Sequence, residues 1–208
     1  MSRLKWIWGL ALGLALITAA RAEAPSAFTR LRDQAQSVES LSAFLARYVG
    51  SCTDLEEKAA CEANARRTRN EITGRLYYVV LDESAARMLK AGAYDPRTRE
   101  FTIEMTPFFE ASGFALTEGA PKGQDGQGHP RIQIEPIFAT LPADWLPMDM
   151  ERLLRTQSLK IHIVFRPLGL WSLPDKGGGK LEGVRAKFLA VRLISARTGE
   201  DVALRLSE

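Results

Sequence analysis

The chain has 208 residues, of which 46% are hydrophobic and 25% charged, a composition typical of a folded globular protein. Its 28 basic and 25 acidic residues give a pI near 9.0, but three of the basic residues and none of the acidic ones lie in residues 1–22. Residues 23–208 therefore carry no net charge, which gives no support to a nucleic-acid-binding function.

The first 22 residues predict a signal peptide. Arg3 and Lys5 precede the apolar residues 6–20, and Ala-Arg-Ala at 20–22 is a cleavage site. The apolar run is shorter than the roughly 20 residues of a membrane-spanning helix, although an uncleaved N-terminal anchor is the alternative. No cysteine follows the cleavage site to accept a lipid. We therefore expect a periplasmic or secreted protein, cleaved near Ala22, with no transmembrane segment in the mature chain.

Two helices are predicted next. From Ser26 to Val49, apolar residues recur at three- and four-residue steps, and Gly50 is a plausible stop signal. This stripe comprises Phe28, Leu31, Ala35, Val38, Leu41, Leu45 and Val49. A second helix is predicted to run to about Thr73, before Gly74, and its many charged residues indicate a solvated surface.

Cys52 and Cys61 are the only cysteines, and an even count in an exported chain predicts a disulfide. Along one continuous helix they would lie about 13 Å apart, beyond the limit of about 7 Å for bridged Cα atoms. The bridge therefore requires a turn between them, which places the start of the second helix near Glu57 rather than at a capping box on Thr53. It would pin a helical hairpin. We expect no redox or metal role, because there is no C-x-x-C motif and no nearby histidine.

Mostly strands are predicted after the helices. Residues 76–81 are β-branched and aromatic, as in a buried strand, although continuation of the helix is the alternative. A short helix is predicted from Glu83 to Ala91, with Asp82 as its N-cap and Gly92 as its stop signal. A turn at 95–98 follows. Further strands are predicted from alternation at 101–105, 131–135, 160–166, 184–194 and 202–206, a short helix at 148–156, and flexible loops at 119–130 and 174–180.

This order of elements predicts a single α+β domain over residues 23–208. A helical hairpin at 23–74 would pack on one face of a mostly antiparallel sheet built from residues 75–208, with inserted short helices. The strand order does not follow from the pattern.

No catalytic motif is present in the sequence, and we expect neither a cofactor nor a metal. Gly123, Gly126 and Gly128 precede His129 and a proline rather than a helix, so they do not form a dinucleotide loop. His129 is interpreted as a solvated loop residue and His162 as a polar strand residue. The chain is therefore not expected to be an enzyme.

The charges are unevenly distributed along the chain. Residues 82–151 carry 6 basic and 12 acidic side chains, and residues 152–208 carry 11 and 5. Cross-strand pairing between the two segments would explain this. The alternative is a basic face for an anionic partner, made by Lys160 and Arg166 on one strand and Arg185 and Lys187 on the next.

Three functions stay open at this point. The leading hypothesis is a non-enzymatic accessory or interaction protein whose partner is an envelope protein or an anionic envelope component. The second is a small-ligand carrier, with a pocket between helices and sheet lined by Tyr77, Tyr78 and Phe108. The third is a hydrolase whose polar residues converge only in three dimensions. The sequence gives no indication of the oligomeric state.

Overall fold

The structure, a computed structural model, describes residues 26–50, 58–81, 87–105, 108–109, 113–123, 135–174 and 179–207. Within these residues the chain is α+β, with two sheets. The helices are α1 (Ser26–Asp33), α2 (Leu41–Val49), α3 (Lys58–Ile72) and α4 (Pro147–Arg155). The strands are β1 (Gln36–Val38), β2 (Tyr77–Leu81), β3 (Leu89–Asp95), β4 (Glu100–Met105), β5 (Phe108–Phe109), β6 (Phe114–Glu118), β7 (Ile137–Thr140), β8 (Leu159–Pro174), β9 (Lys180–Ser195) and β10 (Asp201–Leu206).

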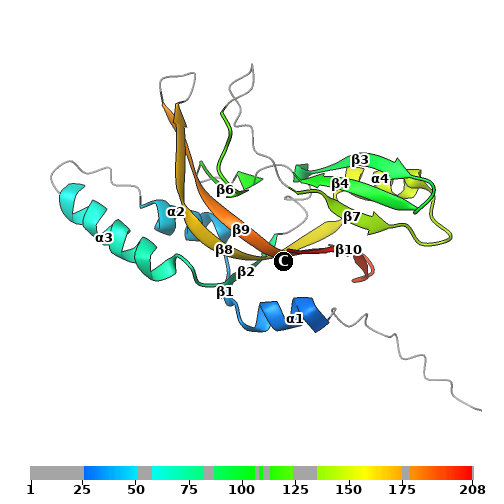
Figure 1. Ribbon diagram of the computed structural model, residues 1–208, viewed down its shortest axis with the longest axis horizontal. Coiled ribbons are helices and arrows are strands. Elements are labelled where there is room, and N and C mark those ends of the chain that lie inside the picture. Colours follow the sequence, from blue (N-terminus) through cyan, green and yellow to red (C-terminus); the bar gives the residue numbers. More distant parts are fainter. Residues whose placement is uncertain are drawn as a thin grey trace, which may run out of the picture.

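The long antiparallel hairpin of β8 and β9 is the centre of the larger sheet (Figure 1). β2 pairs with the free edge of β8, and β1 adds to β2 in parallel. Two strands share the other edge of β9: β10 runs antiparallel along residues 190–194, and β6 runs parallel along residues 182–186. The sheet is therefore mixed, although most of its pairings are antiparallel as predicted.

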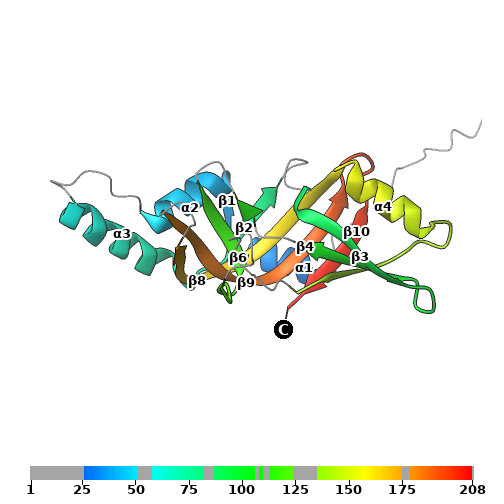
Figure 2. The ribbon, with the colours of Figure 1, turned by 90° about the horizontal axis from the view of Figure 1, so that it is seen from above.

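A second sheet, β3-β4-β7, is wholly antiparallel and packs beside α4. Figure 2 shows both at the end of the molecule away from α3. Phe101, Ile103 and Met105 of β4 are buried and Glu104 between them is exposed, which is the predicted alternation. The prediction of one sheet is corrected to two.

The larger sheet buries side chains on both of its faces. On the inner face, Ile161, Ile163 and Phe165 of β8 belong to the main core, together with α2 and the second sheet. On the outer face, Val164 and Ala190 form a small cluster with Phe28 of α1, which is fully buried. This burial on both faces explains why β8 and β9 lose their apolar and polar alternation in the middle.

The predicted single helix from Ser26 to Val49 is wrong. The strand β1 interrupts it, and α2 starts anew because the hydroxyl of Ser40 accepts a hydrogen bond from the Ala43 amide. The apolar stripe is divided between the two faces. Phe28, Leu31 and Ala35 pack on the outer face, whereas Val38, Leu41, Leu45 and Val49 pack on the inner face. In Figure 1, α1 and α2 accordingly lie on opposite sides of the sheet. A helical hairpin over 23–74 on one face is not confirmed.

The helix predicted to reach Ala91 is also wrong, because β3 begins at Leu89 and pairs with β4 on both sides of Gly92. Residues 82–86 lie outside the described residues, as do residues 124–134, which include most of the predicted strand at 131–135. The strands predicted at 76–81, 160–166, 184–194 and 202–206 and the helix at 148–156 are confirmed. Among the helices described, none has the length and apolarity that crossing a membrane would require.

Candidate anion-binding face

Three basic side chains meet on the outer face of the β8–β9 hairpin. Arg166 and Lys187 are direct partners across the two strands. Arg185 lies two residues before Lys187 and therefore projects from the same face of β9. All three residues are exposed. We call Arg166, Arg185 and Lys187 the basic cluster.

A bulge in β8 shapes this cluster. The register shifts between Pro167 and Gly169, so that Leu168 is an extra residue, and Gly169 pairs with Arg185. Gly169 has φ 152, and a Cβ on it would lie 3.4 Å from Nε of Arg185. The glycine therefore leaves room for the guanidinium of Arg185 to lie against the backbone of β8, on the strand that carries Arg166.

Ion pairs neutralise several other basic residues, but none is described for Arg166 or Arg185. The pairs seen in the described part of the chain are Arg32–Asp33, Arg152–Asp149, Arg192–Asp201 and Arg205 with Glu118 and Glu135. The Arg205–Glu118 pair joins the basic C-terminal segment to the acidic middle segment, although β6 and β10 do not pair with each other and both lie along β9. Neither Arg166 nor Arg185 has a described carboxylate within ion-pair distance.

Lys160, the fourth residue of the predicted basic face, lies apart from the cluster. It pairs with Ile194 at the opposite end of the hairpin, about 20 Å along β8 from Arg166 at about 3.3 Å per residue. The packing of α1 on Val164 lies between the two positions. The structure thus brings three of the four predicted residues together.

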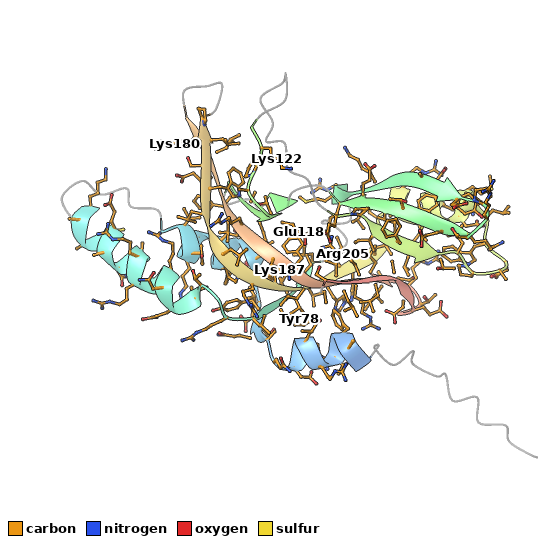
Figure 3. All side chains as sticks on the ribbon, in the orientation of Figure 1. Tyr78, Glu118, Lys122, Lys180, Lys187 and Arg205 are labelled. Atoms are coloured by element: carbon orange, nitrogen blue, oxygen red, sulfur yellow. The ribbon has the colours of Figure 1, made fainter. Side chains whose placement is uncertain are left out.

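A groove of about 930 Å³ adjoins the basic cluster where the ends of β6 and β10 approach each other along β9. Its lining includes Lys187, Leu168, Leu206 and Lys122. Figure 3 shows the labelled side chains of this region, including Lys122, Lys187 and the Glu118–Arg205 pair.

The pair of Glu118 and Arg205 is bidentate and nearly buried. The terminal nitrogens Nη1 and Nη2 of Arg205 each lie 2.9 Å from a carboxylate oxygen of Glu118. Nη1 also donates to the backbone oxygen of Glu135 at 2.6 Å. The side chains are 15% and 8% exposed. This charge-assisted contact joins the end of β6 to β10 beside the groove.

The predicted pocket residues lie in different places. Tyr77 faces inward and lines a groove of about 380 Å³ between α2, α3 and β1, with Phe44 and Arg47. Tyr78 points to the outer face, where its hydroxyl lies 2.5 Å from Nδ1 of His162. Phe108 belongs to β5, and its side chain lies outside the described residues.

The Tyr78–His162 pair sits beneath α1, next to Phe28 and Arg192. The pKa of His162 is lowered from 6.5 to about 4, chiefly by burial and then by the positive charges of Arg192 and Lys160, while Asp201 opposes these effects. Burial also raises the pKa of Tyr78. Both groups are therefore neutral at pH 7, and the tyrosine donates to the unprotonated nitrogen of the imidazole.

This lowered pKa predicts an acid-sensitive fold. The unfolded chain binds a proton near pH 6.5 and the folded chain only near pH 4, so stability is complete above pH 6.5 and falls as the pH drops toward 4. The full shift corresponds to about 3 kcal/mol, and solvent screening of the partly exposed ring reduces the expected loss to about 1–2 kcal/mol. Urea unfolding of the wild type and of His162→Gln, above pH 6.5 and near pH 4, measures this loss of unfolding free energy. Equal pH dependence in the two proteins would contradict the prediction.

Cys61 lies in the first turns of α3, and Cys52 lies outside the described residues. The start of α3 at Lys58 agrees with the predicted start near Glu57. The disulfide itself stays a prediction. His129 also lies outside the described residues, and the described part contains no group of three or more His, Cys, Asp or Glu that could hold a metal ion.

Comparison with curated proteins and with solved structures found no match. These two comparisons therefore assign no function to the chain. A family model matches residues 4–208, which is nearly the whole sequence. The chain belongs to the family of unknown function DUF6066.

Proposed function

We propose that the chain is an exported, non-enzymatic binding module that holds an anionic partner on the basic cluster. The observation that carries this proposal is the meeting of Arg166, Arg185 and Lys187 on one exposed face, with no described carboxylate in ion-pair distance of either arginine. Arg166 and Lys187 are directly opposed like charges, an arrangement that costs stability in an isolated sheet.

A bound anion would be attracted by both guanidinium groups of the basic cluster. Guanidinium groups match carboxylates and phosphates in bidentate geometry, and Arg185 is oriented against the β8 backbone by the bulge at Gly169. Because the mature chain has no net charge, the attraction would come from this local surface and would weaken with salt.

The double variant Arg166→Glu/Arg185→Glu is expected to bind polyanions at least about tenfold more weakly, because two attractions become repulsions. Heparin beads and poly-L-glutamate are suitable probes, read by the NaCl concentration that elutes the protein. Lys160→Glu is the matched control, since it reverses an exposed charge on the same face of the same strand away from the cluster. Equal elution of the wild type and the folded double variant would refute the proposal.

Export and the Cys52–Cys61 bridge belong to the same proposal. They are supported by the signal-peptide pattern and by the separation of α2 from α3. The intact mass of the protein recovered from the envelope or medium is expected to correspond to a chain that begins at Glu23. Alkylation before reduction should add no mass, and alkylation after reduction should label both cysteines. A chain that retains residues 1–22, or that is alkylated at once, would contradict these points.

A small-ligand carrier is the second candidate, favoured by the groove that Tyr77 lines. Its volume of about 380 Å³ falls in the range of small-molecule sites, and Phe44 and Arg47 would offer it an apolar and a cationic contact. Native mass spectrometry of the protein recovered from its own cells tests this candidate. A bound small molecule that is lost in Tyr77→Ala would support it, and a ligand-free mass would count against it.

A further inference from the structure

We propose that the basic cluster and the adjoining groove together dock the protein on the surface of an anionic phospholipid bilayer. This inference rests on the proposed anion-binding function and names its partner as lipid head groups with the acyl boundary behind them. The observation that selects this partner is the presence of exposed leucines beside the basic side chains.

Leu168 and Leu206 line the same groove as Lys187. Their side chains are 45% and 43% exposed, although they belong to the central hairpin and to the strand paired with it. Leu168 is the extra residue of the β8 bulge, next to Gly169, which pairs with Arg185, and Leu206 ends β10 opposite Ala190 on the outer face. Two apolar side chains thus project beside three cationic ones.

A bilayer surface offers partners to both kinds of side chain at once. Phosphate groups accept bidentate hydrogen bonds from guanidinium groups, and the acyl boundary a few ångströms deeper accepts leucine. An acidic polymer or peptide satisfies the charges but leaves the leucines in water. For this reason the observations favour the lipid surface over a soluble polyanion.

The acidic residues of the groove do not cancel its attraction for anions. Glu118 is held in the bidentate pair with Arg205 and is only 15% exposed. Glu135 is 71% exposed, 4.0 Å from Arg205, and lies on the rim. Glu135→Gln is therefore expected to strengthen binding to anionic vesicles, by up to about fivefold for one charge near the surface.

The test is co-sedimentation of the purified protein with vesicles of phosphatidylglycerol and phosphatidylcholine in equal amounts, and with vesicles of phosphatidylcholine alone. The wild type is expected to bind the mixed vesicles at low salt and to be released by NaCl. Binding to pure phosphatidylcholine would instead indicate nonspecific apolar attachment, as by an uncleaved N-terminal segment, and would overturn the proposal. Intact mass identifies the N-terminus of the protein used.

Two variants separate the charges from the leucines. Arg166→Glu/Arg185→Glu is expected to lose at least about 25-fold in vesicle affinity, at about fivefold per basic residue. Leu168→Ser/Leu206→Ser is expected to lose about tenfold, because partial burial of leucine contributes on this scale, while its elution from heparin stays unchanged. Leu146→Ser, which alters a 59% exposed leucine outside the groove, should bind as the wild type does.

The outcomes distinguish this inference from the proposed function. Binding to heparin or polyglutamate through the cluster without binding to mixed vesicles would overturn the lipid surface and leave the anion-binding module intact. Unchanged vesicle binding in Leu168→Ser/Leu206→Ser would also overturn it. If Arg166→Glu/Arg185→Glu binds every anionic probe as well as the wild type does, both the lipid surface and the anion-binding function are overturned. If the double charge variant fails to fold, Arg185→Ala replaces it, because a truncation removes the positive charge without introducing a negative one.

Discussion

Replacing Gly50 by alanine is expected to lower the free energy of unfolding by about 2–4 kcal/mol. Gly50 caps α2 with φ 71, where an L side chain costs about 1 kcal/mol. Its added Cβ would also overlap the Cβ of Ala65 in α3, an overpacking that costs about 1–3 kcal/mol. The helices cannot easily separate, because Nη1 of Arg69 donates to the Val49 oxygen at 2.8 Å. A fall in Tm of about 6–12 °C is the corresponding observation for a domain of this size.

Two further variants isolate the steric part of this effect. Gly74→Ala places a Cβ at φ 85 with nothing within 4 Å, so it should cost only about 1 kcal/mol. Ala65→Gly should partly rescue Gly50→Ala in a double-mutant cycle, because it removes the atom that the new Cβ meets. Strict additivity of Gly50→Ala and Ala65→Gly would show that α2 and α3 do not pack as described.

Replacing Arg205 by methionine is expected to destabilise the fold by about 3 kcal/mol or more, because breaking a buried ion pair leaves an uncompensated charge. Glu118 would lose both of its 2.9 Å contacts while only 15% exposed, and the backbone oxygen of Glu135 would lose its donor. Urea unfolding at neutral pH measures the change. The expected result is a lower urea concentration at the unfolding midpoint, with no change in the dependence of the unfolding free energy on urea concentration.

The double variant Glu118→Gln/Arg205→Met is expected to be more stable than Arg205→Met alone, since the amide carries no charge to bury. Arg152→Met is the matched control for Arg205→Met. It removes an exposed ion pair with Asp149 at 3.9 Å and should change the free energy of unfolding by less than about 1 kcal/mol. A loss in Arg205→Met as small as that in Arg152→Met would mean that solvent reaches Glu118.

Elements with a strong local signal could be predicted from the sequence. The alternation at Phe101, Ile103 and Met105 and the apolar middle of β9 gave strands, and Pro147 marked the start of α4. The failures come from pairing between distant segments. Gln36–Val38 forms a strand because Tyr77–Val79 lies beside it, and nothing in the helical spacing around it reveals this. Ser40 was the available local signal, as an N-cap directly before Leu41.

The candidate site was predictable only in part, for the same reason. Alternation placed Arg166 on one face of its strand and Arg185 with Lys187 on one face of theirs, and only the register of β8 on β9 makes these faces one surface. The distance of Lys160 from Arg166 follows from their six-residue separation on one strand, at about 3.3 Å per residue, and could have been recognised from the sequence. The bulge at Leu168 had a signal in Pro167 and Gly169, since these residues disturb a regular strand.

The shared edge of β9 has a consequence for how the protein folds. β2, β6 and β10 all depend on the β8–β9 hairpin for their place, and β6 reaches its partner across more than sixty intervening residues (Glu118↔Ala186). Such a topology has a high contact order, and contact order slows folding toward the range of milliseconds to seconds. Until the hairpin has formed, β2 and β6 lack the strands with which they pair in the larger sheet. The larger sheet is therefore completed only after the C-terminal hairpin has formed.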